Sequence, residues 1–409
     1  MKKYFCVLLA AVLVCLSVVP CSASDNAGFT DQSSIRNYNA VRMLYDLGLI
    51  SGYSDGSFGP EKAVSREEVA KLMALLSTAE PEQETTQTYV PFYDAQTSWA
   101  APYIAYCAEQ NVIAGDNGRF RPSDSVTLRE LAKMLLVILG EDPARYVGAS
   151  WAANVDEDAF TRGIYTGLTA GYGTAASRDD ACLLIYNAML CPKVADAAAE
   201  GDQRYVLDAL MNPMSYLEIR FGLTRYTATL TGNECADLTT GSKLAAGVTK
   251  LAGHKEFSIS TDLSLLGRSV DIYVKDGKVF GVPCYAVDET YYTFSEAAAL
   301  KDICAGGGFR LDDATAYYYN YAPASKDILN SAASNDKITV IDHDGDHVFD
   351  VVLVTTSRPA TVTALSPLTV DVDGQSFETQ GFARTDTFAV GDEVYFSQIL
   401  GTGYIRRLN

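Results

Sequence analysis

The sequence is poor in the residue patterns that mark catalysis. It has three histidines among 409 residues, and His254, in LAGHKEF, has no evident Ser or Cys partner. It contains no HExxH, no G-x-S-x-G, no Walker loop and no dinucleotide fingerprint. Its nine cysteines include no C-x-x-C pair, so a zinc knuckle or redox motif of that spacing is excluded. We therefore predict no enzyme activity, although the paired carboxylates of a glycosidase would come together only in the fold.

Positive charge and long apolar runs are also scarce. The 32 Lys and Arg residues face 51 Asp and Glu residues, a net charge of −19 that argues against nucleic acid or anionic membranes as partners. The apolar start, MKKYFCVLLAAVLVCLSVVPCSASDNA, predicts a secretory signal peptide over 1–23. Cys21 offers a lipoprotein alternative, for which Pro20 is a poor fit. No later stretch approaches the ~18 apolar residues of a membrane helix, so no span is expected after cleavage. The six remaining cysteines leave the disulfide state open.

What the chain does have is a duplicated segment. Four residues recur 63 positions later: Phe29, Asp31, Ile50 and Gly52 as Phe92, Asp94, Ile113 and Gly115. Each copy predicts a helix, a Gly- and Pro-containing loop (GYSDGSFGP or GDNGRFRP) and a second helix. We expect Asp31 and Asp94 to cap the first helices. Ser65 with Glu68, and Thr127 with Glu130, predict capping boxes for the second helices.

These repeats resemble the S-layer homology domain of bacterial cell-surface proteins. The opening F-x-D, the glycine loop and the SREE string at 65–68 carry the resemblance. A third, degraded copy has SRDD at 177–180 but a shortened loop, YGTAA. The resemblance implies units at 29–77, 92–140 and 146–191 that pack as a pseudo-threefold helical bundle. It places the chain outside the cell, at the cell wall or S-layer.

The resemblance also implies a ligand. Such domains bind secondary cell-wall polysaccharide, often pyruvylated, in grooves between units. Arg66 and Arg178 hold the arginine position of the motif, where a guanidinium suits a sugar carboxylate. Trp99 and Trp151 offer faces on which a sugar ring stacks. The binding residues predicted from this resemblance are Arg66, Arg178, Asp31, Asp94, Trp99, Trp151 and Arg129.

Two departures from the motif limit this prediction. Leu128 stands at the arginine position of the second copy, with Arg129 one residue on, and the first copy has Arg36 where the second has Trp99. We therefore expect at most two competent grooves. The alternative is that Arg66 and Arg178 only brace the bundle and that Trp99 fills its core.

Residues 194–409 have a different sequence pattern. Residues 194–222 predict a linker helix, and 223–409 predict one or two small all-β barrel or sandwich modules, so the protein is a multi-domain α+β chain. YVKDGKV, for example, indicates two strands joined by an Asp-Gly turn.

The string IDHDGDHVFDVV at 341–352 carries four spaced acids, Asp342, Asp344, Asp346 and Asp350. They match part of a calcium loop, but His347 and Leu353 stand where such a loop has Gly and an acid. A hairpin turn with solvated acids is the simpler interpretation. His343 and His347 also leave a transition-metal site as a third alternative.

Two functions follow from these patterns. The first is non-covalent anchoring to the cell wall, with the β region as a spacer or as a surface for other surface proteins. The second is an anchored extracellular hydrolase of glycans with its site in 223–409. Cofactors are not expected, apart from the calcium alternative.

Overall fold

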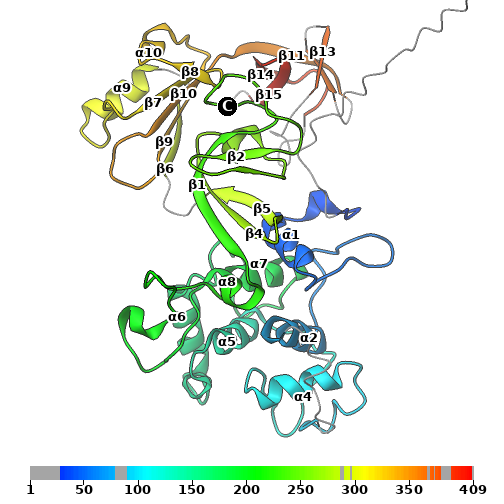
Figure 1. Ribbon diagram of the computed structural model, residues 1–409. Helices are drawn as coiled ribbons and strands as arrows, with labels where there is room; N and C mark the ends of the chain where they lie inside the picture. The colour runs from blue at the N-terminus through cyan, green and yellow to red at the C-terminus, as the bar shows by residue number, and fades with distance from the viewer. Residues whose placement is uncertain are drawn as a thin grey trace, which may run out of the picture.

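A computed structural model describes residues 28–78, 90–285, 290–294, 297–365, 369–372, 374–378 and 388–407. The helices of residues 28–222 gather at one end of the molecule and three sheets follow at the other (Figure 1). The predicted signal peptide lies outside the described residues. Among the described residues, no helix is long and apolar enough to cross a membrane.

The helical part contains pairs of helices joined by loops. Its longer helices are α1 (Tyr38–Asp46), α2 (Arg66–Ser77), α4 (Ala101–Glu109), α5 (Leu128–Leu139), α6 (Trp151–Thr161) and α7 (Arg178–Leu190). Short helices precede, interrupt or follow this series: η1 (Gln32–Ser34) before α1, η2 (Pro143–Tyr146) between α5 and α6, and η3 (Gly201–Arg204) and α8 (Tyr216–Phe221) after α7. The predicted capping boxes are confirmed, because the Ser65 and Thr127 hydroxyls accept the N–H groups of Glu68 and Glu130. Each such cap stabilises a helix by about 1 kcal/mol.

The prediction that Asp31 and Asp94 cap the first helices is wrong. The Asp31 carboxylate instead accepts the N–H groups of Phe58 and Gly59, both at 2.8 Å, and Asp94 does the same for the equivalent loop of the second copy. Burial raises the pKa of both carboxyls, but these backbone bonds outweigh it and hold each pKa below its ordinary value. The two aspartates therefore fasten the glycine loops to the start of each repeat.

Three short segments that precede α2, α5 and α7 bond to one another in a closed ring. The Val64 N–H donates to the Ala176 carbonyl at 2.9 Å, Ala176 donates to Val126 at 2.8 Å, and Val126 donates back to Val64 at 3.0 Å. All three side chains are buried. Each of the three helix–loop–helix segments thus contributes one equivalent strand-like residue to a common centre.

The first sheet is packed against the helical part. Helix α1 lies between the other helices and strand β5 (Lys278–Tyr285), as Figure 1 shows. The Gly281 N–H donates to the Asp46 carboxylate at 3.0 Å, and a Cβ at Gly281, whose φ is +69°, would lie 2.8 Å from the Met43 side chain. Tyr273 and Phe280 join the hydrophobic core of the helices. The sheet and the helices therefore share a packed boundary.

The β region forms three sheets of five strands within the described residues. The first contains β1 (Thr224–Gly232), β2 (Thr249–Leu251), β3 (Glu256–Phe257), β4 (Ser269–Lys275) and β5. The second contains β6 (Thr290–Phe294), β7 (Ala316–Tyr319), β8 (Ala322–Ala324), β9 (Lys337–Asp342) and β10 (Val351–Thr355). The third contains β11 (Arg358–Leu365), β12 (Thr369–Val372), β13 (Gln375–Glu378), β14 (Glu393–Ile399) and β15 (Thr402–Arg407).

The fold is mixed α+β, as expected, but three details of the prediction are wrong. The strand order of each described sheet is open rather than closed into a barrel, and the second sheet carries helices α9 (Ala297–Ala305) and α10 (Ile328–Ser331). The expected linker helix over 194–222 is α-helical only in α8; its other described residues form turns, isolated bridges and η3. The Asp276-Gly277 turn between β4 and β5 is confirmed, and both residues have positive φ.

Candidate functional site

Arg66 crosses from the start of α2 to the loop of the second repeat. Its Nε donates to the Phe120 carbonyl at 2.8 Å and its Nη2 donates to Ala114 at 3.2 Å. Its Nη1 pairs with the Glu130 carboxylate at 2.9 Å, and the side chain is 7% exposed. The guanidinium also lies 4.8 Å from the centre of the Phe120 ring. Arg66 is therefore a buried, fully engaged brace between two repeats.

Arg178 makes the equivalent crossing from α7 to the loop of the first repeat. Its Nε donates to the Phe58 carbonyl at 3.0 Å and its Nη2 donates to Ser51 at 3.1 Å. Its guanidinium lies 4.9 Å from the centre of the Tyr53 ring and 4.8 Å from that of Phe58. Arg178 is partly exposed, and no described carboxylate lies within ion-pair distance of it. The bracing that the sequence left as an alternative is thus present for both arginines.

Each arginine also lines a groove between repeats. The groove that we call the Trp99 groove has a volume of about 210 Å³. It is lined by Leu49, Ile50, Ser51, Val64, Glu68, Lys71, Leu72, Trp99, Arg178, Ala181, Cys182 and Ile185. The Trp151 groove has a volume of about 460 Å³. It is lined by Arg66, Ala114, Gly115, Asp116, Arg121, Glu130, Lys133, Met134, Tyr146, Val147, Gly148 and Trp151.

The two grooves repeat one arrangement of side chains. Both contain an arginine from the start of one helix (α7 or α2), a glutamate and a lysine from a second helix (α2 or α5), and a tryptophan from near the start of a third (α4 or α6). The lysine ammonium lies 6.0 Å from the centre of the tryptophan ring in both, Lys71 with Trp99 and Lys133 with Trp151. Trp99 is 56% exposed, so it does not fill the core. An open aromatic face beside cations is suited to a sugar that carries a negative charge.

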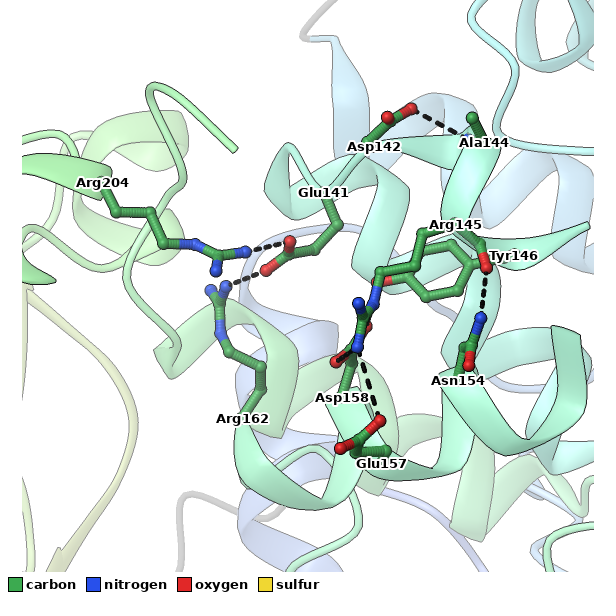
Figure 2. A network of polar contacts seen from close by, with 10 residues as sticks. All are labelled: Glu141, Asp142, Ala144, Arg145, Tyr146, Asn154, Glu157, Asp158, Arg162 and Arg204. Atoms are coloured by element: carbon green, nitrogen blue, oxygen red, sulfur yellow. Dashed lines mark hydrogen bonds and ion pairs between the residues drawn. The ribbon is translucent and has the colours of Figure 1, made fainter. Parts of the chain in front are cut away.

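A polar network holds one wall of the Trp151 groove (Figure 2). The Tyr146 hydroxyl donates to Asp158 at 2.9 Å, and Arg145 pairs with the same carboxylate at 2.6 Å. Nearby, the buried Glu141 binds Arg162 at 2.6 Å and also Arg204. The network ties the 143–148 segment to α6, and burial and the Asp158 charge raise the pKa of Tyr146. The wall is therefore fixed before any ligand binds.

Arg129 lies outside both grooves. It forms a bidentate pair with Asp156, with bonds of 2.7 and 2.8 Å, and this pair raises the pKa of Arg129. Arg36, at the position that corresponds to Trp99, pairs with Asp179 and Asp180 at 3.3 Å. Ion pairs between α7 and the start of the first repeat thus engage Arg36, which stands where the second repeat has Trp99.

The structure brings together four of the seven predicted binding residues, two in each groove: Arg178 with Trp99, and Arg66 with Trp151. Asp31, Asp94 and Arg129 are engaged elsewhere, as described above. Sequence reasoning missed Lys71 and Lys133. Their common spacing of 62 residues, which Glu68 and Glu130 share, is the signal that identifies them.

The acidic string of the β region lies between β9 and β10, which pair as an antiparallel hairpin as predicted. Asp342, Asp344 and Asp350 place carboxylate oxygens within 4.8 Å of one another. The buried Asp342 already accepts the N–H groups of Asp344, Gly345 and His347, while Asp346 accepts that of Val348. These bonds suffice to shape the turn. They match calcium ligation only in part, and calcium stays a prediction.

Comparison with known proteins agrees with the repeats. Residues 28–70 and 91–132 match the S-layer homology domain. The middle cell wall protein of Brevibacillus brevis is 24% identical over 300 residues, which are 68% of this chain and 28% of that protein. The surface-layer 125 kDa protein of Lysinibacillus sphaericus is 30% identical over 181 residues, 41% of this chain and 15% of that protein.

A third relative is named as an uncharacterized cell wall amidase of Bacillus anthracis. It is 29% identical over 176 residues, 40% of this chain and 32% of that protein. The matches thus span about a third or less of the length of these relatives. The repeats, their loops and these matches agree: the chain contains two S-layer homology repeats, at 28–70 and 91–132, and the relatives that it matches are named as cell wall and surface-layer proteins.

Proposed function

We propose that this protein attaches to the bacterial cell wall by binding secondary cell-wall polysaccharide in the Trp99 and Trp151 grooves. The observation that carries the proposal is the recurrence of one set of groups, arginine, lysine, glutamate and tryptophan, in both grooves. A core needs no such pattern, because a tryptophan that is 56% exposed beside a lysine contributes little to packing.

We further infer that three units, the third at 146–191, form a pseudo-threefold bundle. The ring of bonds through Val64, Val126 and Ala176 supports this inference, as does the crossing of Arg66 and Arg178 to the loops of neighbouring units. The ring explains why the grooves lie between units rather than within them. Each groove needs an arginine from one unit, a lysine from another and a tryptophan from the third.

The chemistry of the grooves fits an acidic glycan. A tryptophan face packs against the C–H groups of a sugar ring, while guanidinium and ammonium groups bind a carboxylate such as that of a pyruvylated sugar. Glu68 is available to accept a sugar hydroxyl through the oxygen that does not cap its helix, whereas the second oxygen of Glu130 already binds Arg66. Binding of a repeating polymer at two grooves is stronger than binding at either groove alone. Once one groove holds the polymer, the other groove meets it at a high effective concentration.

The β region then serves as a spacer or as an interaction surface for other surface proteins. The packed boundary at Asp46 and Gly281 makes the first sheet a rigid extension of the anchor. The alternative of an anchored hydrolase with its site in this region has less support. Among its described residues, the buried carboxylates of Asp237, Asp271 and Asp342 bind neighbouring Thr, Arg or backbone groups and so brace turns and strands.

The proposal is tested by cosedimentation of the chain without residues 1–23 with purified wall sacculi, before and after extraction of the attached polysaccharide. We expect binding to disappear on extraction and in the Trp99→Ala/Trp151→Ala double variant. Phe160→Ala is the matched control, since Phe160 is an aromatic residue of α6 that is 73% exposed and lies outside both grooves. Binding that survives both extraction and the double variant would refute the proposal.

A further inference from the structure

The two grooves differ in the charge that they offer to a ligand. In the Trp151 groove, Arg66 forms an ion pair with Glu130 at 2.9 Å, and the exposed Arg121 lies 3.8 Å from Asp124. Asp116 adds a further negative charge to the lining, and Lys133 is half-buried. Burial lowers the pKa of Lys133, the Glu130 charge opposes this, and the Arg66 charge adds to it. Arg66 and Arg121 of this groove therefore each already lie beside a carboxylate.

The Trp99 groove is lined by two cations, Arg178 and Lys71, and one acid, Glu68, which caps α2 rather than pairing with Arg178. Arg178 bonds only to backbone carbonyls and ring faces among its described contacts, and Lys71 is exposed. Lys62, with its ammonium 3.6 Å from the centre of the Tyr53 ring, shares that ring with Arg178. Asp116 and Asp124 of the second repeat correspond to Tyr53 and Lys62 of the first.

We propose that the grooves divide the polymer chemically: the Trp99 groove binds the carboxylate-bearing residue of the wall polysaccharide, and the Trp151 groove binds an uncharged sugar of the same chain. This inference rests on the proposed function. An unpaired guanidinium binds a carboxylate directly, whereas Arg66 would first have to exchange its bond to Glu130. The larger volume of the Trp151 groove, about 460 Å³ against about 210 Å³, suits a neutral sugar that is held mainly by its ring face and hydroxyls.

The chain itself provides the means to test this division, because its two tryptophans lie one in each groove. Labelling with 5-fluorotryptophan gives two fluorine NMR signals, which Trp99→Phe and Trp151→Phe assign. The ligand is polysaccharide released from sacculi by muramidase, either native or with its carboxyl groups chemically reduced. We expect native polysaccharide to shift both signals. Reduction should weaken the response of Trp99 by about tenfold or more and leave that of Trp151 within about twofold.

A variant that frees Arg66 to bind a ligand carboxylate provides a second test. Glu130→Gln retains the capping box, since Gln also caps at that position, but it frees Arg66 from its carboxylate. The response of Trp151 in this variant should become dependent on the ligand's carboxyl groups. Glu68→Gln, the equivalent change in the Trp99 groove, should leave Trp99 dependent on them, because Glu68 forms no ion pair with Arg178.

The outcomes separate the two proposals. The inference is overturned if carboxyl reduction weakens both signals equally, weakens neither, or acts mainly on Trp151. It is also overturned if, in the Glu130→Gln variant, the response of the Trp151 signal is the same for native and for carboxyl-reduced polysaccharide. If native polysaccharide shifts neither signal, the proposed function itself fails and the division of the grooves fails with it.

Discussion

The most demanding prediction concerns the difference between Arg66 and Arg178, which occupy the same motif position. Arg66→Ala removes a buried guanidinium that binds two backbone carbonyls and the Glu130 carboxylate. Glu130 would then lose its ion-pair partner, and the carbonyls of Phe120 and Ala114 would lose their donors. Breaking a buried ion pair by removing one partner costs about 3–5 kcal/mol, and because the Glu130 side chain is 30% exposed we expect a loss of about 3 kcal/mol in the free energy of unfolding.

Arg178→Ala should cost much less. This side chain is partly exposed and its described hydrogen bonds go to two backbone carbonyls, those of Phe58 and Ser51. Water replaces such donors at an exposed groove, and the expected loss is about 1–2 kcal/mol. The difference between the two losses in the free energy of unfolding therefore measures the contribution of the burial of Arg66 and of its ion pair with Glu130.

Equilibrium urea denaturation, followed by tryptophan fluorescence, measures the free energy of unfolding of both variants. Trp99 and Trp151 both lie in the helical part, so the signal follows the unfolding of that part of the molecule. The reasoning is refuted if Arg178→Ala destabilises as much as Arg66→Ala, or if Arg66→Ala costs under about 1 kcal/mol.

Two further predictions concern titratable groups in the helical part. The pKa values of Asp31 and Asp94 are depressed in the fold, so their stabilising bonds are present above the unfolded pKa and are lost as pH falls through the folded one. The urea midpoint should therefore fall between about pH 4 and pH 2, and the double Asn variant should flatten that fall; equal slopes would contradict the assignment. Burial raises the pKa of the Cys107 and Cys182 thiols to about 12, so both should resist iodoacetamide at neutral pH until urea unfolds the chain, as mass spectrometry of the alkylated peptides would show.

The local features of the repeats were predictable because each depends on residues that lie next to one another or a few positions apart in the sequence. The capping boxes at Ser65 and Thr127 and the Asp-Gly turn at 276–277 each depend on backbone geometry within a few positions. The motif arginines and the two tryptophans were identified as groove residues from the resemblance to the S-layer homology domain, which assigns a role to each position of the repeat.

The features that depend on contacts between distant segments could not be predicted in this way. Asp31 lies at the right place for a cap, yet the loop that it binds is 27 residues away, and nothing local to Asp31 indicates that choice. The pairing of Arg66 with Glu130 joins two repeats, and only their packing brings the two groups together. Likewise, α9 and α10 lie among strands of Tyr and Val that dominate the pattern of the β region, and the boundary between Gly281 and Met43 requires the whole fold.

The central claim is that soluble wall polysaccharide and the wall itself compete for the same grooves. The most direct measurement is release of the bound chain from sacculi by increasing amounts of purified polysaccharide, with the free protein quantified after sedimentation. The account predicts complete, saturable release of the wild-type chain. Protein that remains on the sacculi at saturating polysaccharide would contradict the account, because attachment would then depend on a surface other than the two grooves.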